Sequence, residues 1–334
     1  MKRKIVWMEI HDPRIQKIED QMAPEGFEII RPQSRTDREE HLQLMQEADY
    51  VIAGGIPIPA DYIAQAPKLK MIQKWGIGLD KVDCRRAEQE GIGVCITAGE
   101  NAVPVAELAV GLMIAVNRRI PYVDASMRKG RWMKTEIRPQ CYMMRDKVVG
   151  LLGIGNIARH VAELLKGFHC SMIYYDVARL PKEEEERLGV SYVNFDTLIQ
   201  KADILSLHLP LTPQTRGMIG AEEFRKMKNT AILVNTSRGG VVDESALYEA
   251  LKSGEIRGAG LDTFEMEPVS PDLPLLRLEN VVLSSHCGGG VVDNVVNMTR
   301  HAYGNIQRFD RGEPIDERDV VVPAGREADV LCSV

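Results

Sequence analysis

Arginine, glutamate and histidine side chains follow three separate apolar runs in the second half of the chain, as Arg238, Glu267 and His286. Histidine exchanges protons near neutral pH, and a carboxylate beside it favours the charged ring and fixes its orientation. Arginine offers a planar fork to a carboxylate and a carbonyl, a geometry that lysine lacks. Together these groups suit hydride transfer to a 2-keto acid, because the nascent alkoxide needs a proton donor. We therefore predict that His286 is the general acid and base, Glu267 its partner and Arg238 the substrate ligand.

Each of the three side chains also has an ordinary structural explanation. Arg238 alone would suit a surface ion pair, Glu267 a solvated loop, and any one of the seven histidines is more often structural than catalytic. Their order, and their positions after apolar runs, favour the catalytic interpretation, because the carboxyl ends of parallel strands meet at one edge of a sheet. His208, in LSLHLP, is the rival proton donor. Its apolar surroundings indicate instead a structural histidine near a cofactor.

A glycine-rich turn, G-I-G-N-I-A from Gly153 to Ala158, connects an apolar run to an amphipathic helix. This is the G-x-G-x-x-A form of the dinucleotide-binding fingerprint. Gly153 permits the tight turn, Gly155 lets the backbone approach a pyrophosphate, and Ala158 lets the helix pack close to the sheet. The N–H groups that open the helix would face the phosphates. We predict a dinucleotide site at this turn.

Asp176 ends the next apolar run, 23 residues after Gly153. This is near the spacing of about 20 expected for a carboxylate that accepts hydrogen bonds from the ribose hydroxyls. Such a carboxylate repels a 2′-phosphate, so NAD is favoured over NADP. Arg179 is the one feature that would soften this preference.

Short apolar runs alternate with helix-like polar segments along the chain, which predicts parallel sheets covered by helices on both faces. Among the first hundred residues we predict strands at 5–8, 27–30, 50–53, 70–74 and 94–97, with helices at 38–48 and 81–89. Six further strands, the number of a full dinucleotide domain, are predicted at 148–152, 172–175, 204–209, 231–235, 258–262 and 281–284. We also expect helices at 101–119 and 291–309, and then a polar tail that frays. The fold class is α/β, with doubly wound parallel sheets.

The bulk composition limits what the protein can be. Its 334 residues suffice for two domains, and a net charge of −6 argues against nucleic-acid or membrane partners held by bulk electrostatics. The N-terminal apolar run is too short for a signal peptide, and residues 102–116 are too interrupted for a membrane span. The cysteines form no C-x-x-C pair and indicate reduced thiols in a cytoplasmic protein without a zinc site: Cys84, Cys95, Cys141, Cys170, Cys287 and Cys332.

Two further segments have functional interpretations. The turn KWGIGLD, from Lys74 to Asp80, follows a predicted strand, and its glycines would expose N–H groups to a carboxylate; a plain connecting turn is the alternative. The helix at 101–119 and the basic tract SMRKGRWMK after it favour dimer packing or a domain hinge over contact with a membrane surface.

Six motifs between about Met71 and Gly290 occur in the order that one enzyme family shows: KWGIGLDKVD, ENAVPVAELAVGLM, LLGIGNIA, LHLPLTPQTRGMI, NTSRGGVVDESALYEALKSGEIRGAGLDTFEMEP and SSHCGGG. On these motifs the chain resembles the D-isomer-specific 2-hydroxyacid dehydrogenases. The resemblance implies an NAD-dependent oxidoreductase acting on a D-2-hydroxy acid or 2-keto acid, and a homodimer that forms through residues 101–132. It further implies a Rossmann cofactor domain, 101–290, inserted in a flavodoxin-like substrate-binding domain, 1–100 plus 291–334.

The resemblance also assigns site residues. Arg238, Glu267 and His286 would form the catalytic set. The cofactor would contact Val105, Gly153, Gly155, Asn156, Ile157, Asp176, Leu209, Pro210, Thr215, Thr236, Ser237, Arg238, Asp262, His286 and Gly288. The substrate would contact Lys74, Trp75, Gly76, Ile77, Gly78, Arg238 and His286, its carboxylate being held by the backbone amides of the glycine turn.

The resemblance leaves the substrate open among 3-phosphoglycerate, glycerate, glycolate, lactate and related acids. Lys74 stands where phosphoglycerate-type relatives carry a cation, and would meet a phosphate or second carboxylate, or else face solvent. Relatives usually carry an apolar residue beside the histidine, and this chain has Cys287 there. The cysteine would act either as a small hydrophobic residue or as an oxidation-sensitive thiol. We expect no C-terminal regulatory domain. Because the family includes corepressors with the same Arg, Glu and His set, an NAD(H)-sensing binding scaffold is the alternative function.

Overall fold

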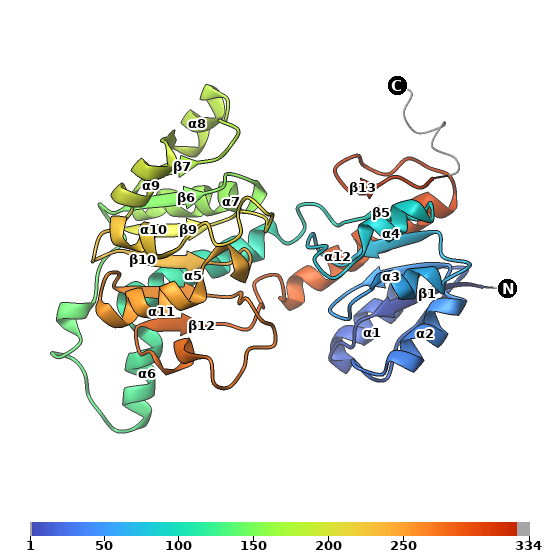
Figure 1. Cartoon of the computed structure of the whole chain (residues 1–334), viewed down its shortest axis with the longest axis horizontal. Coiled ribbons are helices and arrows are strands. Elements are labelled where there is room, and N and C mark those ends of the chain that lie inside the picture. The colour runs from blue at the N-terminus through green and yellow to red at the C-terminus, as the bar shows by residue number, and fades with distance from the viewer. Residues whose placement is uncertain (1, 326–334) are drawn as a thin grey trace. The chain divides into compact units, whose positions relative to one another are not determined.

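The computed structural model describes residues 2–325, which form two compact units (Figure 1). The first unit combines the residues before Ala102 with those from Gly290 onward, and the second unit is Ala102–Gly289. The chain therefore leaves the first unit once, builds the whole second unit, and returns.

The first unit is built on one sheet. Its strands are β1 (Arg3–Met8), β2 (Phe27–Ile30), β3 (Tyr50–Ala53), β4 (Met71–Lys74), β5 (Gly93–Cys95) and β13 (Val320–Val322). Its helices are α1 (Pro13–Gln21), α2 (Arg38–Glu47), α3 (Ala60–Ala64), α4 (Cys84–Gln89) and α12 (Val292–Asp310). Within the described residues the strand order is β13-β5-β4-β3-β1-β2, and every pair is parallel except β13 with β5. Apart from β13, this is the flavodoxin-like order.

Local sequence explains these elements. Strands β1 and β3 are rich in β-branched and aromatic residues, and the last four residues of β1 and all of β3 are buried, as central parallel strands must be. Aspartates begin three of the helices, where the side chains of Asp12, Asp37 and Asp83 accept hydrogen bonds from first-turn N–H groups. Helices α2, α3 and α4 cover one apolar layer of the sheet, and α12 covers the other around Trp7.

The second unit contains the glycine fingerprint. Its strands are β6 (Val148–Leu152), β7 (Ser171–Tyr175), β8 (Val190–Tyr192), β9 (Ile204–Leu207), β10 (Ile232–Asn235), β11 (Gly258–Leu261) and β12 (Val281–Leu283). Its helices are α5 (Ala102–Arg118), α6 (Ile120–Arg128), α7 (Asn156–Leu165), α8 (Lys182–Leu188), α9 (Phe195–Lys201), α10 (Ala221–Lys226) and α11 (Glu244–Ser253). Short 3₁₀ helices lie at Arg138–Gln140, Lys166–Phe168, Gly239–Val241 and Pro274–Arg277.

The described strands of the second unit form an all-parallel sheet in the order β12-β11-β10-β9-β6-β7-β8. This is the doubly wound dinucleotide-binding order with one strand added at the β12 edge, and its switch point lies between β6 and β9. Helices α5 and α7 pack on one face, and α9, α10 and α11 on the other (Figure 1). The α/β, doubly wound prediction is confirmed for both units.

Small residues in β11 have a packing reason. A Cβ added at Gly258 would lie 2.9 Å from Cγ1 of Val116, and one added at Gly260 would lie 3.0 Å from Cβ of Leu112. Both contacts are with α5, which therefore rests directly on the backbone of β11. Only glycine allows this close approach.

The structure corrects several predicted elements. Seven strands, not six, form the described second sheet, because the short segment β8 pairs with β7. The predicted frayed tail is wrong from Val320 to Val322, where a β-branched run pairs antiparallel with β5. The strand predicted to reach residue 209 ends at Leu207, three residues before Pro210. The helix predicted at 101–119 ends at Arg118, since the backbone of Arg119 is left-handed (φ 55°) and α6 follows.

Among the described helices, none combines the length and apolarity that crossing a bilayer requires.

Candidate active site

The glycine turn of the second unit has the geometry of a phosphate cradle. Gly153 has φ +91°, and a Cβ there would lie 2.7 Å from the carbonyl oxygen of His208, so no other residue fits. An added Cβ at Gly155 would meet nothing within 4 Å, which leaves the backbone open to a ligand. Gly155 also begins α7 without a side-chain cap, so the first N–H groups of this helix are available to an anion. Ala158 is fully buried against the sheet, as predicted.

Asp176 lies beside this turn. Its Oδ2 accepts a hydrogen bond from the N–H of Ile154 at 2.8 Å, and its Oδ1 accepts one from the N–H of Ala178 at 3.2 Å. An ionised carboxylate has about four acceptor sites, so lone pairs remain for ribose hydroxyls. Arg179 is held by Glu185 through two hydrogen bonds of 2.9 Å. The cation that would favour a 2′-phosphate is thus already paired.

The remaining predicted cofactor residues of the second unit gather at the same sheet edge. Leu209 lies beside Gly153, and an added Cβ at Gly288 would lie 3.3 Å from Val105. Thr236, after β10, has a buried hydroxyl that makes no hydrogen bond to any described residue. An orphaned buried hydroxyl at this edge is the kind of group that a bound ligand satisfies. Thr215, by contrast, donates its hydroxyl to the carbonyl of Pro210 at 2.7 Å and so stabilises its own loop.

These observations fit a dinucleotide. The turn, the uncapped helix and the oriented carboxylate would hold the pyrophosphate and ribose of NAD, and the orphaned Thr236 hydroxyl marks the edge that the nicotinamide half would approach. Asn156 and Ile157 open α7 at the position where such a pyrophosphate would lie.

The structure brings His286 and Glu267 together. Nδ1 of His286 lies 2.7 Å from Oε2 of Glu267, whose other oxygen accepts a hydrogen bond from the N–H of Phe264 at 3.0 Å. Since an ionised carboxylate only accepts, Nδ1 is the protonated nitrogen, and Nε2 is left to exchange a proton. The histidine side chain is 47% exposed and that of Glu267 28%, so the ring is accessible from solvent.

A buried carboxylate holds the turn that carries His286. Asp262 is 2% exposed, and its Oδ1 accepts hydrogen bonds from the hydroxyl of Ser284 (2.7 Å) and the N–H of Cys287 (2.9 Å). Its Oδ2 accepts from the N–H of Gly288 at 3.0 Å, and its carbonyl from the N–H of His286 at 2.7 Å. His286 itself is left-handed, with φ 52°. Asp262, predicted only as a cofactor contact, is therefore also the brace of the histidine turn.

Arg238 is positioned by a second set of contacts. The amide of Asn235 donates to the carbonyl of Arg238 at 2.9 Å and accepts from the N–H of Ser237 at 3.0 Å. The next residue, Gly239, has no room for a side chain: an added Cβ would lie 1.9 Å from the carbonyl carbon of Phe264. The Arg238 segment thus packs directly on the loop that leads to Glu267. Sequence reasoning missed Asn235, although an amide at the end of a buried strand is a signal for such a brace.

His208 differs from His286 in its environment. It directly follows β9 and is partly buried, and its Nε2 lies 2.9 Å from the hydroxyl of Ser206. Burial lowers the pKa of His208 to about 4, so its ring is neutral at physiological pH. A neutral, partly buried ring next to the glycine turn supports the structural role predicted for it.

The predicted substrate residues of the first unit follow β4. The N–H of Gly76 donates to the hydroxyl of Thr97 at 3.0 Å, so it is not available to a substrate carboxylate. The N–H groups of Ile77 and Gly78 have no partner among residues 2–325. Lys74 does not point freely into solvent, because its Nζ donates to the carbonyl of Gly54 at 2.8 Å. The ring of Trp75 packs 4.9 Å from that of Trp7.

Two predicted absences concern metals and disulfides. The described part of the chain holds no group of three or more histidine, cysteine or acidic side chains that could bind a metal ion. All the cysteines within it are free thiols, and Cys287 is exposed, whereas Cys332 lies outside the described residues.

Comparison with known proteins gives consistent results. Residues 110–288 match the family model described as the D-isomer specific 2-hydroxyacid dehydrogenase, NAD binding domain. The chain is 38% identical over 315 residues to a glyoxylate reductase of Korarchaeum cryptofilum, with 93% of each protein covered. It is 35% identical over 307 residues to a D-3-phosphoglycerate dehydrogenase of Archaeoglobus fulgidus. This alignment covers 92% of the present chain but only 58% of that longer protein.

Solved structures agree with these matches. An NAD-dependent formate dehydrogenase from Staphylococcus aureus, in complex with NAD, superposes with a TM-score of 0.84 at 25% identity, over 97% of this chain and 100% of that one.

Proposed function

Since the chain belongs to the D-isomer specific 2-hydroxyacid dehydrogenase family and matches its NAD binding domain, we propose that it transfers a hydride between nicotinamide and C2 of a D-2-hydroxy acid or 2-keto acid. We propose His286 as the general acid and base, Glu267 as its partner and Arg238 as the substrate ligand. The observation that carries this proposal is the 2.7 Å contact between Nδ1 of His286 and Glu267, which leaves Nε2 for the substrate.

The residues have distinct tasks in this proposal. When bound, NADH supplies the hydride that adds to C2 of the keto acid. Nε2–H of His286 gives its proton to the carbonyl oxygen, so that the alkoxide becomes a hydroxyl, and the reverse reaction returns that proton. Glu267 keeps the ring oriented and stabilises its charged form. The guanidinium of Arg238 binds the substrate carboxylate and polarises the carbonyl.

Substrate binding also involves the first unit in this proposal. The unpartnered N–H groups of Ile77 and Gly78 suit the substrate carboxylate, and Gly76 contributes the turn (φ +107°) rather than a hydrogen bond. Lys74 would meet a phosphate or second carboxylate on a larger substrate, and Trp75 would limit its size. The named relatives act on glyoxylate and 3-phosphoglycerate, so we propose a small 2-keto acid of this range.

The direct test is NADH oxidation, with NADPH in parallel, against glyoxylate, hydroxypyruvate and phosphohydroxypyruvate. We expect turnover with at least one acid and a preference for NADH, because Asp176 repels a 2′-phosphate and Arg179 is paired. A larger rate with NADPH would contradict the role of Asp176. Tight NADH binding without turnover on any acid would instead favour the sensing scaffold.

Single substitutions test the catalytic roles. His286→Ala and Arg238→Ala should still bind NADH but lose turnover by about 10²-fold or more. The control is His160→Ala, which removes an exposed histidine of α7. Full turnover in either site variant would remove that residue from the mechanism. An equal loss of turnover in the control would mean that the substitutions destabilise the folded protein and do not identify catalytic groups.

We further propose a cytoplasmic homodimer. Exposed apolar side chains on and after α5 support the dimer: Val103, Ile120, Met127, Trp132 and Met143. Light scattering on the purified protein should give twice the chain mass, and Trp132→Glu should give the monomer. The free thiols of the described residues support the compartment, and fractionation of cells checks it.

A further inference from the structure

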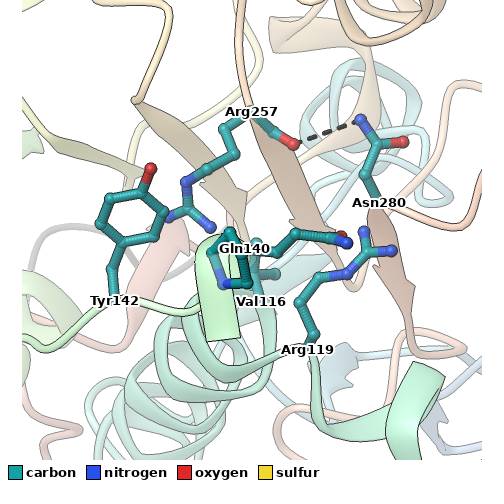
Figure 2. A pocket seen from close by; sticks show the side chains of 7 residues that line it. Val116, Arg119, Gln140, Tyr142, Arg257 and Asn280 are labelled. Atoms are coloured by element: carbon teal, nitrogen blue, oxygen red, sulfur yellow. Dashed lines mark hydrogen bonds between the residues drawn. The ribbon is translucent and has the colours of Figure 1, made fainter. Parts of the chain in front are cut away.

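The second unit contains a cavity, lined mostly by polar side chains, at the amino ends of its parallel strands. The candidate active site lies at their carboxyl ends. The cavity has a volume of about 250 Å³ and is lined by Val116, Arg119, Pro139, Gln140, Tyr142, Arg257 and Asn280 (Figure 2). Arg257 directly precedes β11 and Asn280 directly precedes β12. Asp262 and His286 follow the carboxyl ends of the same two strands, so this cavity is separate from the candidate active site.

The cavity concentrates positive charge without compensation. Two of its lining residues are arginines and none is acidic. Within residues 2–325, neither Arg119 nor Arg257 has a carboxylate oxygen within 4.0 Å, whereas Arg179 and Arg187, for example, are each paired with a glutamate. Partly buried cations without a counter-charge are costly, and proteins usually pair them.

Arg257 is held rigidly in this cavity. Its Nε donates to the carbonyl of Thr230 at 3.1 Å, and its Nη2 donates to Oδ1 of Asn117 at 2.5 Å. The guanidinium carbon lies 4.3 Å from the ring centre of Tyr142. Burial, and to a lesser extent the charge of Arg119, lower the pKa of Arg257. An anion would relieve both penalties and would find the guanidinium already in place.

Arg119 has a hydrogen-bonding group that no residue satisfies. Its Nε is buried and has no partner in the described part of the chain. The backbone is left-handed at this residue, where α5 ends and α6 begins, and the guanidinium carbon lies 4.7 Å from the ring centre of Tyr122. The side chain is thus fixed from both ends while a buried donor stays unused, which points to a ligand that is not part of the chain.

The chemistry selects the class of ligand. Two guanidinium groups from separate elements offer more donors than the two oxygens of a single carboxylate can serve well, whereas a phosphate group presents three strong acceptor oxygens. A phosphate carries about −1.5 to −2 at pH 7, which matches two guanidinium groups. The cavity corresponds to about eight water volumes, enough for a phosphate and part of an attached group. Gln140 adds a neutral amide at the rim.

We propose that this cavity is a binding site for a small phosphate dianion, either inorganic phosphate or the phosphate group of a small phosphomonoester, with Arg119 and Arg257 as its ligands.

The test is calorimetric titration of the full-length protein with inorganic phosphate, at constant ionic strength and with saturating NADH to keep phosphate out of the glycine turn. We expect one saturable site per chain that Arg119→Gln and Arg257→Gln each weaken by about tenfold or more. Arg118→Gln, which removes a neighbouring exposed charge, should stay within about twofold of wild type. If Arg257→Gln fails to fold, Arg119→Gln alone decides, since the buried Nε of Arg119 has no hydrogen-bond partner among the described residues and its loss breaks no such contact.

Parallel titrations separate the sources of the anion. Tighter binding of glycerol phosphate than of inorganic phosphate would assign the site to a phosphomonoester, and the reverse to the free ion; both support the proposal. Absence of saturable phosphate binding, or equal binding by Arg119→Gln and wild type, would overturn it. A lower assembly mass of Arg119→Gln, with phosphate binding unchanged, would also overturn it, because the arginine would then serve a contact between two copies of the chain.

Discussion

Replacing Asp262 with asparagine tests how the second unit holds His286 in place. The two side chains have the same shape, but the amide has one acceptor oxygen where the carboxylate has two. In the structure Oδ1 of Asp262 serves Ser284 and Cys287, and Oδ2 serves Gly288. Whichever way the amide turns, its NH₂ group faces at least one N–H donor of the turn. One hydrogen bond to a charged acceptor is lost and one buried donor is left without a partner.

The magnitude follows from these contacts. A hydrogen bond to a charged group contributes about 1.5–3 kcal/mol, and Asp262 is buried, so solvent cannot replace it. The left-handed backbone conformation of His286 costs roughly 1–2 kcal/mol, and the hydrogen bonds of the turn to Asp262 must offset that cost. We expect the free energy of unfolding of the second unit to fall by about 2–3 kcal/mol, which for a domain of this size lowers the transition temperature by roughly 4–12 °C. A displaced His286 ring would also transfer its proton less efficiently, and kcat should fall about tenfold for each 1.4 kcal/mol that this displacement adds to the activation barrier.

Scanning calorimetry and steady-state kinetics with NADH measure both effects, and fluorescence titration measures NADH binding. The matched control is Asp272→Asn, which removes one exposed carboxylate from the following loop. A transition temperature and a kcat both equal to those of wild type would refute the argument that Asp262 braces the histidine turn. A loss of NADH affinity alone, with normal stability and kcat, would show that Asp262 acts only as a cofactor contact.

Three further predictions concern packing, pH and cofactor choice. Gly239→Ala forces a Cβ to within 1.9 Å of the Phe264 carbonyl carbon, so turnover should fall steeply while NADH still binds; normal turnover would contradict this. Because the folded pKa of His208 is about 4 against 6.5 unfolded, the unfolded chain takes up the proton first. Stability should therefore fall by up to about 3 kcal/mol between pH 6.5 and 4 in urea titrations, and equal slopes in His208→Gln and wild type would disprove the assignment. Glu185→Gln should release Arg179 and raise the NADPH-to-NADH ratio of kcat/KM, whereas an unchanged ratio would mean that the pair does not set the preference.

Features that depend on neighbouring residues were predictable from the sequence. The strand at 148–152 has the predicted bounds, because an apolar run between polar residues and a glycine turn leaves little choice of register. The same holds for the fingerprint, whose glycines at 153 and 155 have the conformation and open space that their spacing indicates. Family membership followed from long, ordered motifs and is confirmed.

Features that depend on distant residues were not predictable. The bond between the Gly76 N–H and Thr97 joins residues 21 positions apart, and it removes a donor that the turn alone would have offered to a substrate. Asp262 accepts from residues more than 20 positions away. Strand β13 is three residues long and obtains its pairing only from β5. The catalytic roles of the site residues stay predictions until the variants are assayed.

Strand β11 links the two edges of the second unit. Its amino end follows Arg257, and its carboxyl end leads to Asp262, only five residues on. Between them, Gly258 and Gly260 lie in direct contact with α5, so the strand cannot shift without a clash against that helix. Close-packed interiors yield little to small forces, and a ligand at the amino end should therefore leave the Asp262 brace where it is. Phosphate binding and turnover thus report on opposite ends of one rigid strand. A negative phosphate titration would leave the proposed reaction untouched, and an inactive His286 variant should still bind phosphate.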